Sequence, residues 1–386
     1  MSGVPLRADQ ICVGRPIEHD VFDARGKLLL KRGFIIQSVG QRDRLIDEGL
    51  YVEPKPDAAH APAAWSALHH AGRGVPVLER IRGIRAALEP LLEQAPPELP
   101  QAIAPVAAEI ARMVELDPDA ALASVLVERD GNYSPRHALN CAIVVDRLLQ
   151  GGEVPPPVRP TLLAATLTMN ISMTALQNEL DAQASPLSAA QQEAVRTHAA
   201  RSAAKLRQRG VADPAWLAAV EHHHDDAVGG TGVGTPAEMI ALADRYCAAV
   251  TGRQYRAGLV PATVLREIFM QGGRGVNPML AKLLVREMGI YPPGSVVELA
   301  NRDMAVVVKR MPHANQPVVR SVVNGMNARL DPPLKRLTSD PMFAVKAAVG
   351  ADRLKQPIDP KVFWADAFEL APDPAQAAST TLAITG

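Results

Sequence analysis

The chain has 386 residues, and its 41 lysine and arginine side chains balance 41 aspartate and glutamate side chains. This length predicts two or three domains, and a hydrophobic fraction of 47% is enough for a large buried core. Zero net charge argues against a general binder of nucleic acid or anionic membranes, because such proteins need a strong positive field. Aromatic residues make up only 4% of the chain, which favours helix–helix packing over a β-sandwich.

The sequence carries no signal for membrane insertion or for a disulfide framework. No run of about 18 apolar residues occurs, and the first ten residues lack the apolar core of a signal peptide. The three cysteines, Cys12, Cys141 and Cys247, are far apart and form no CxxC pair, so neither a zinc ribbon nor a disulfide scaffold is indicated. We expect a cytoplasmic protein of bacterial type, with Cys141 and Cys247 on apolar helix faces in the core.

The first part of the chain is predicted to be a small β-rich domain, residues 1–54. An Asp-Ala-Arg-Gly turn at 23–26 separates a short strand from an apolar run, and a short helix is expected over 41–49. Residues 55–76 are rich in proline, alanine and glycine and are predicted to be a linker.

The rest of the chain is predicted to be mainly α, which is the expected fold class of the protein. Over 77–290 apolar residues recur with a helical period, and Asp117-Pro118 and Asn277-Pro278 each supply an N-cap followed by a first-turn proline. Residues 291–350 have the pattern of strands, with a hairpin turn at 300–303. Residues 351–386 are predicted to be a tail.

Histidines on several predicted helices are the candidates for chemistry. His137, His198 and the triplet His222, His223 and His224 lie in the helical part, and Asp244 lies on a later helix. Helical bundles build metal sites from imidazoles and carboxylates that several helices direct to one point. The alternative for the triplet is a solvated helix end, where imidazolium interacts favourably with the helix dipole.

The order and spacing of these residues resemble the HD-GYP phosphohydrolases of the HD superfamily, over about residues 132–291. In that resemblance His137 and His198 match two helix histidines, and Asp244 matches the aspartate of the "ADxYDALT" helix. His223 and His224 match the paired histidines, although a register shift by one would make His222 and His223 the pair. The N-terminal unit and the β extension also resemble segments that flank such domains. The resemblance implies a helical fold. It also implies an enzyme that hydrolyses the bacterial messenger cyclic di-GMP at a centre of two or three iron or manganese ions.

Several positions depart from the family pattern. Met169, Asn170 and Met173 stand where the family has the histidine and aspartate of its name and a lysine. In the loop, Val233 and Gly234 replace tyrosine and proline. Tyr133 stands one turn before His137, where three-metal members have a glutamate.

These departures weaken the case for hydrolysis. An aspartate can bridge two cations, whereas Asn170 offers a neutral carbonyl oxygen and Met169 a soft thioether that suits Mn²⁺ and Fe²⁺ poorly. Without a metal pair, the hydroxide that attacks phosphorus has no source near neutral pH. We therefore expect no intact catalytic set, and the sequence leaves enzyme activity open. His137, His198, His223, His224 and Asp244 are the candidate ligands of one divalent ion (Fe, Mn or Zn), or of none.

Arg253 and Arg256 match the basic residues that hold the nucleotide phosphates in the resembled family. Three residues apart, they are expected on one helical face, where each presents a fork to phosphate. The alternative is an ordinary solvated face.

Three hypotheses about function remain open. The first is a non-catalytic regulator in cyclic di-GMP signalling that binds the nucleotide, a signalling partner such as a diguanylate cyclase, or both. The second is an active metal-dependent phosphodiesterase with an unusual metal site, and the third is a scaffold or homodimerisation module. No nucleic-acid or membrane partner is expected.

Overall fold

The computed structural model describes most of the chain beyond residue 75. Its described residues are 76–364, except 153, 155–157, 226–233, 272–274 and 355–357, together with 4–5, 21–22, 28–30, 34, 36, 38 and 51–52. The predicted helix over 41–49, residues 55–75 of the predicted linker (55–76) and residues 365–386 of the predicted tail (351–386) lie outside them. The chain divides into two compact units, Met1–Ala61 and Pro62–Gly386.

The first unit contains a small antiparallel sheet. Its strands are β1 (Val4–Pro5), β2 (Val21–Phe22), β3 (Leu28–Leu30) and β4 (Tyr51–Val52), in the order β1-β4-β2-β3. β2 and β3 pair on either side of the predicted turn at 23–26. The β character expected for this region is therefore present.

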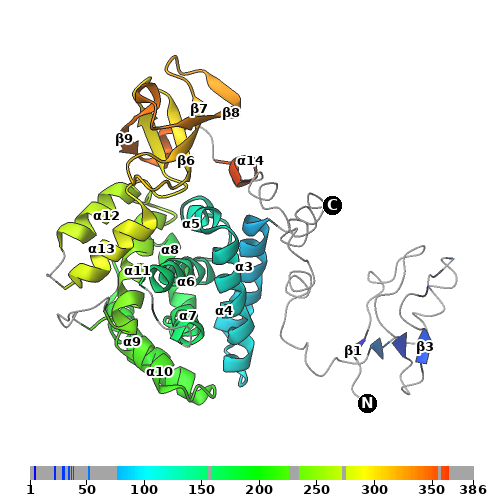
Figure 1. The fold of residues 1–386 in the computed structure, drawn as a ribbon. Helices are drawn as coiled ribbons and strands as arrows, with labels where there is room; N and C mark the ends of the chain where they lie inside the picture. The colour runs from blue at the N-terminus through cyan, green and yellow to red at the C-terminus, as the bar shows by residue number, and fades with distance from the viewer. Residues whose placement is uncertain are drawn as a thin grey trace, which may run out of the picture. The chain divides into compact units, whose positions relative to one another are not determined.

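The second unit is built on helices (Figure 1). Their bounds are α3 (Val77–Gln94), α4 (Leu99–Leu116), α5 (Pro118–Val127), α6 (Tyr133–Gly151), α7 (Val158–Thr168), α8 (Thr174–Ala182), α9 (Ala189–Gln208), α10 (Pro214–Glu221), α11 (Pro236–Thr251), α12 (Pro261–Met270) and α13 (Pro278–Met288). The expected fold class, mainly α, is confirmed.

Helix α6 is the centre of this bundle. It contacts α3, α4, α5, α7, α8, α11 and α13, and every residue from 133 to 146 is buried. An α-helix hidden on nearly all sides can bury polar side chains only where partners are at hand. The buried polar residues of α6 are therefore candidates for a functional site.

The predicted helix starts at Asp117 and Asn277 are confirmed. The Asp117 carboxylate accepts hydrogen bonds from the backbone N–H groups of Asp119 and Ala120, at 3.1 and 2.9 Å. The Asn277 side-chain oxygen accepts in the same way from Met279 and Leu280, at 2.9 and 3.2 Å. A side-chain oxygen that satisfies these otherwise unpaired donors is what makes Asp and Asn good N-caps.

A five-stranded antiparallel sheet follows the bundle. Its strands are β5 (Val296–Leu299), β6 (Met304–Lys309), β7 (Val318–Val323), β8 (Arg329–Leu337) and β9 (Val345–Val349), in the order β8-β7-β6-β5-β9. β5 and β6 pair around the predicted hairpin turn. The short helix α14 (Pro360–Trp364) attaches through the Trp364 indole, which donates to the Val308 carbonyl at 3.2 Å.

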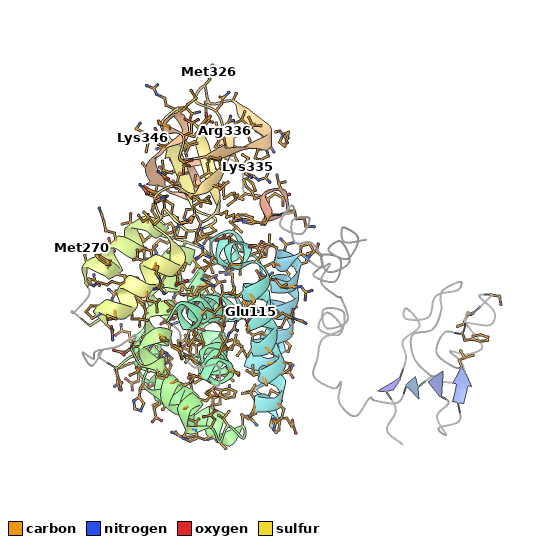
Figure 2. All side chains as sticks on the ribbon, viewed as in Figure 1. Glu115, Met270, Met326, Lys335, Arg336 and Lys346 are labelled. Atoms are coloured by element: carbon orange, nitrogen blue, oxygen red, sulfur yellow. The ribbon has the colours of Figure 1, made fainter. Side chains whose placement is uncertain are left out.

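Exposed methionines mark two points of the surface of this unit. Met270, at the end of α12, is 75% exposed, and Met326, in the turn between β7 and β8, is 86% exposed (Figure 2).

Among the described residues, no helix combines the length and apolar character needed to cross a bilayer.

Candidate metal centre

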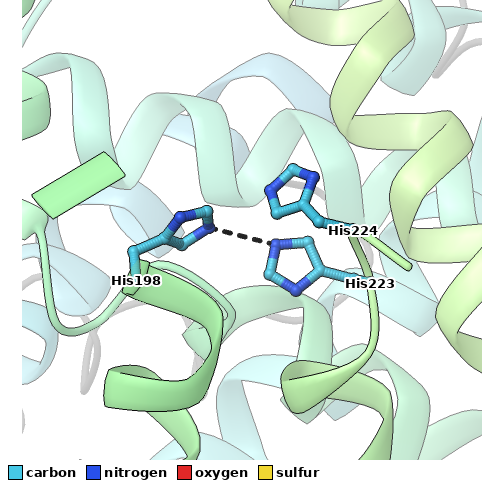
Figure 3. A group of neighbouring side chains, drawn as sticks. All are labelled: His198, His223 and His224. Atoms are coloured by element: carbon cyan, nitrogen blue, oxygen red, sulfur yellow. Dashed lines mark hydrogen bonds between the residues drawn. The ribbon is translucent and has the colours of Figure 1, made fainter. Parts of the chain in front are cut away.

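Three histidines converge between two helical segments. His198 comes from the middle of α9, and His223 and His224 from the turn that follows α10 (Figure 3). Their nearest ring nitrogens all lie within 4.8 Å of one another. His222 is exposed and faces the Asp225 carboxylate at 2.8 Å instead. The structure therefore places His223 and His224, and not His222, beside His198.

The tautomers of two of these histidines follow from their backbone contacts. His198 Nδ1 lies 2.6 Å from the Val195 carbonyl oxygen, and His223 Nδ1 lies 2.7 Å from that of Val220. A carbonyl oxygen can only accept, so each Nδ1 carries the hydrogen and each Nε2 carries a lone pair. The two Nε2 atoms face each other at 3.2 Å.

Burial keeps this pair of nitrogens unprotonated. It lowers the pKa of His198, and burial together with the neighbouring His224 lowers the pKa of His223 to about 4. At neutral pH no proton lies between the two lone pairs, so they repel. Two ligands of one tetrahedral cation with metal–nitrogen bonds of about 2.05 Å would be about 3.3 Å apart. The observed separation fits two ligands of a single ion.

The other predicted ligands form a second group. His137 Nε2 lies 2.6 Å from Asp244 Oδ1, across the contact between α6 and α11. The Cys141 sulfur lies 3.6 Å from the same nitrogen, and the nearest donor atoms of the three residues lie within 4.8 Å of one another. Burial alone would raise the pKa of Asp244, but the hydrogen bond from His137 and the nearby His223 and His224 lower it to about 2. This group therefore includes an ionised carboxylate at neutral pH.

Cys141 is the donor that the sequence interpretation missed. It was expected to be a core residue, and it is indeed fully buried, but its sulfur also faces the ligand cluster. Its position four residues after His137 was the available signal, because residues at that spacing share a helix face. The predicted ligands also do not meet at one point, since they divide into a three-histidine group and a His137–Cys141–Asp244 group.

Tyr133 connects the second group to Arg253. The Tyr133 ring stacks on the His137 ring with centroids 5.2 Å apart, and its hydroxyl lies 3.4 Å from His137 Nδ1. The Arg253 guanidinium lies over the Tyr133 ring, 4.7 Å from its centroid. Arg253 Nη1 is buried and makes no hydrogen bond among the described residues.

The expectation that Arg253 and Arg256 share a helical face is wrong. Helix α11 ends at Thr251, and Gly252 follows with φ +66°. A side chain at Gly252 would bring its Cβ within 2.4 Å of a backbone nitrogen. The two arginines close a tight turn, in which the Arg253 N–H donates to the Arg256 carbonyl at 2.8 Å and the reverse bond measures 3.0 Å. Arg253 is half-buried and Arg256 is exposed.

Met169, Asn170 and Met173, which stand where the resembled family has its doublet and lysine, lie in the turn between α7 and α8. Met169 is fully buried within the hydrophobic core, and Asn170 is 8% exposed with a buried side-chain oxygen that has no partner among the described residues. The Ser172 hydroxyl donates to the His198 carbonyl at 3.0 Å, so this turn lies against the helix that carries His198. Met173 is half-buried and precedes α8. Val233 lies outside the described residues.

A cavity opens beside both groups. It has a volume of about 400 Å³, and its walls include His223, His224, Asp244, Arg245 and Asn277. The buried Asn277 side-chain nitrogen has no partner among the described residues. The volume falls in the usual range of about 300–1,000 Å³ for small-molecule sites.

The donor sets fit single ions better than a bridged pair. Three imidazoles suit Zn²⁺, Mn²⁺ or Fe²⁺, and among the described residues no carboxylate joins the three-histidine group. Asn170 lacks the charge with which an aspartate would hold two cations close together. One ion per group is the occupancy that the residues support.

The fold and these clusters define a helical protein with a candidate metal centre. We compared its sequence and structure with those of known proteins. No family model matches the chain. The chain is similar to the cyclic di-GMP phosphodiesterase PA4108 of Pseudomonas aeruginosa, with 26% identity over 212 residues. That match covers 52% of this chain and 50% of the relative, so it spans about half of each protein.

A solved structure resembles the chain more loosely. It is Bd1817, an HDG"Y"P protein from Bdellovibrio bacteriovorus, with 14% identity, a TM-score of 0.48 and coverage of 73% of this chain and 98% of that one. The similarity to a cyclic di-GMP phosphodiesterase agrees with the resemblance that the residue spacing indicated.

Proposed function

We propose that this chain is a cyclic di-GMP signalling protein of the HD-GYP type that binds the nucleotide without hydrolysing it. The similarity to a cyclic di-GMP phosphodiesterase supports the ligand class. The departures around Met169 and Asn170 argue against turnover. Control of a partner protein, such as a diguanylate cyclase, is part of the same proposal.

The turn at 169–173 is the observation that carries this proposal. Met169 packs into the core, and Asn170 offers no charge beside the helix of His198. A two-metal hydrolase needs a bridging anion to hold its ions close enough to activate a water between them. A single ion held by His198, His223 and His224 would attract a phosphate oxygen but would leave this water unactivated.

The nucleotide has suitable partners in the chain itself. Arg245 and the Asn277 side-chain nitrogen line the cavity beside the histidines. Arg253 presents an unpaired nitrogen next to Tyr133, and a guanidinium can donate two parallel hydrogen bonds to a phosphate. Arg253 is therefore the residue whose removal should weaken binding most.

Calorimetry with cyclic di-GMP tests the binding. We expect the wild type to bind and Arg253→Ala to lose at least about tenfold in affinity, since a charge-assisted hydrogen bond contributes roughly 1.5–3 kcal/mol. Arg196→Ala is the matched control, because Arg196 is an exposed arginine whose ion-pair partner in the described part of the chain is Glu193, also on α9. No heat from the wild type at high micromolar nucleotide would contradict the proposal.

An assay of cyclic di-GMP hydrolysis by the manganese-loaded protein tests the second part of the proposal, the absence of turnover. We expect no product from the wild type and a gain of hydrolysis in the double variant Met169→His, Asn170→Asp, because it restores the imidazole and the bridging anion. Hydrolysis by the wild type that His223→Ala abolishes would establish an active phosphodiesterase instead. A chain that binds neither metal nor nucleotide would fit the scaffold or homodimerisation hypothesis.

A further inference from the structure

A cysteine belongs to the second donor group. Cys141 lies one helical turn after His137 on α6, and its sulfur is 3.6 Å from His137 Nε2. Asp244 reaches the same nitrogen from α11. The proposed function makes no use of this thiol.

The spacing of the donors suits a tetrahedral ion. With metal–sulfur and metal–nitrogen bonds of about 2.3 and 2.05 Å, two tetrahedral ligands would be about 3.5 Å apart, close to the observed 3.6 Å between Cys141 and His137. The pair His137–Asp244, now 2.6 Å apart in a direct hydrogen bond, would have to open to about 3.4 Å. The Asp244 side chain is 20% exposed and lines the cavity, so it has room for this movement.

His137 has the surroundings expected of a metal ligand. Ligating histidines usually donate the hydrogen of their other ring nitrogen to a nearby oxygen, which orients the ring. The Tyr133 hydroxyl lies 3.4 Å from His137 Nδ1, and its ring stacks on the imidazole. In the metal-free protein His137 Nε2 carries the hydrogen that it donates to Asp244; with that hydrogen on Nδ1 instead, the Nε2 lone pair would be free for a cation beside Cys141 and Asp244.

Charge and access also fit a divalent cation. On binding, the ion would displace the proton of the Cys141 thiol to solvent. The resulting thiolate and the Asp244 carboxylate together carry two negative charges, so the bound ion would be neutralised, which a buried site requires. Cys141 is fully buried and His137 is 3% exposed, while Asp244 opens onto the cavity and gives the ion a route in. Among the described residues, the three-histidine group itself includes no thiol or carboxylate.

We propose that His137, Cys141 and Asp244 form a three-ligand site that takes a thiophilic divalent cation, Zn²⁺, in preference to Mn²⁺ or Fe²⁺. A thiolate favours zinc over these harder ions, and three protein ligands leave one coordination position open to the cavity. Cys247 contacts the Cys141 thiol but stands outside the group of donors, so it is not a ligand. The inference goes beyond the proposed function, because it needs neither nucleotide binding nor the loss of hydrolysis.

Cobalt spectroscopy on the full chain tests the thiolate ligand. His223→Ala provides the background, because it disables the three-histidine group. Co²⁺ added to this variant should produce a near-ultraviolet band from thiolate-to-cobalt charge transfer, and Zn²⁺ should displace it. The band should vanish in Cys141→Ser and persist in the matched control Cys247→Ser. Absence of the band, or its survival in Cys141→Ser, would overturn the proposal.

A second measurement needs no change at Cys141, which matters because a buried substitution could impair folding. X-ray absorption of the zinc-loaded His223→Ala protein should detect one sulfur neighbour at about 2.3 Å, and competition with Mn²⁺ should favour zinc by at least about 100-fold. A shell of nitrogen and oxygen alone would refute the site. Because cyclic di-GMP is absent from both experiments, their failure is distinct from a failure of the proposed function.

Discussion

At the scale of single residues, the candidate centre depends on which nitrogen of each imidazole carries the hydrogen. His198 and His223 use the same local device, since each Nδ1 donates to a carbonyl three residues earlier in its own segment. That bond orients the ring and leaves Nε2 free for a cation. The two segments then bring these nitrogens to 3.2 Å.

Substitutions within the histidine triplet should show which of its residues bind the metal ion. We expect His223→Ala to lower the affinity of the three-histidine group for Zn²⁺ by more than about 100-fold, because it removes a ligand and not only an outer-shell partner. His222→Ala should leave the affinity unchanged, because His222 is exposed and, within the described residues, faces the Asp225 carboxylate and not His198. Metal titration against a chromophoric chelator measures both variants, and equal losses would contradict the assignment.

At the scale of elements, one arginine joins three helices around the site. Arg159, on α7, contacts the Asp146 carboxylate on α6 at 2.6 and 2.9 Å and the Ala111 carbonyl on α4 at 3.1 Å. Asp146 is fully buried. This ion pair anchors the start of α7, the helix whose other end leads into the turn that carries Met169 and Asn170.

Replacement of Arg159 should destabilise the fold in a pH-dependent way. Burial raises the pKa of Asp146, and the Arg159 hydrogen bonds partly offset that rise. Without Arg159 the folded-state pKa rises further, so the ionised carboxylate costs more at neutral pH, whereas below the unfolded pKa both states hold the proton. We expect Arg159→Met to lower the free energy of unfolding by about 3 kcal/mol at pH 7, and by clearly less near pH 4.

Urea unfolding at the two pH values measures this loss. Glu115→Gln is the control, because Glu115 pairs with the same arginine through a side chain that is 56% exposed, and an exposed pair contributes at most about 1 kcal/mol. A loss in Arg159→Met that stayed constant from pH 7 to pH 4 would exclude the buried Asp146 charge as its cause.

The start of α5 offers a second prediction at this scale. The Asp117 carboxylate caps two backbone N–H groups, so Asp117→Ala should lower the free energy of unfolding by about 1 kcal/mol. Asp117→Asn retains the capping oxygen and should stay much closer to the wild type. Thermal unfolding of the two variants compares them, and equal destabilisation would show that the charge matters rather than the cap.

At the scale of the whole molecule, the candidate site belongs to one of the two units. All residues of both donor groups, the cavity and the turn at 169–173 fall within Pro62–Gly386. The boundaries expected from the sequence, at 54, 76, 290 and 350, stay predictions.

A chain that begins at Pro62 should therefore fold and bind metal by itself, since a compact unit with its own core can in principle fold alone. We expect its melting temperature and its cobalt spectrum to match those of the full chain. Calorimetric melting and the cobalt titration measure this, and loss of cooperative unfolding would mean that the first unit is needed for stability.

Much of the fold could be predicted because its signals are local. The helical period over 77–290, the N-caps at Asp117 and Asn277 and the hairpin turn at 300–303 each depend on residues a few positions apart. The candidate ligands were found in the same way, from spacing along the chain. The prediction for Arg253 and Arg256 was wrong because helix α11 ends at Thr251. The next residue, Gly252, lies too close to another backbone segment to carry a side chain, and that contact appears only in the three-dimensional structure.

By itself, the sequence determined the mainly α class and named the candidate metal ligands, and it placed Met169 and Asn170 where the resembled family has its doublet, because each of these follows from residue type and spacing. Only the tertiary structure decided that the ligands divide into two groups, that His223 rather than His222 faces His198, and that Cys141 joins His137 and Asp244. Those facts depend on how α6, α9 and α11 pack and rotate against one another, which is determined by contacts between residues far apart in the chain.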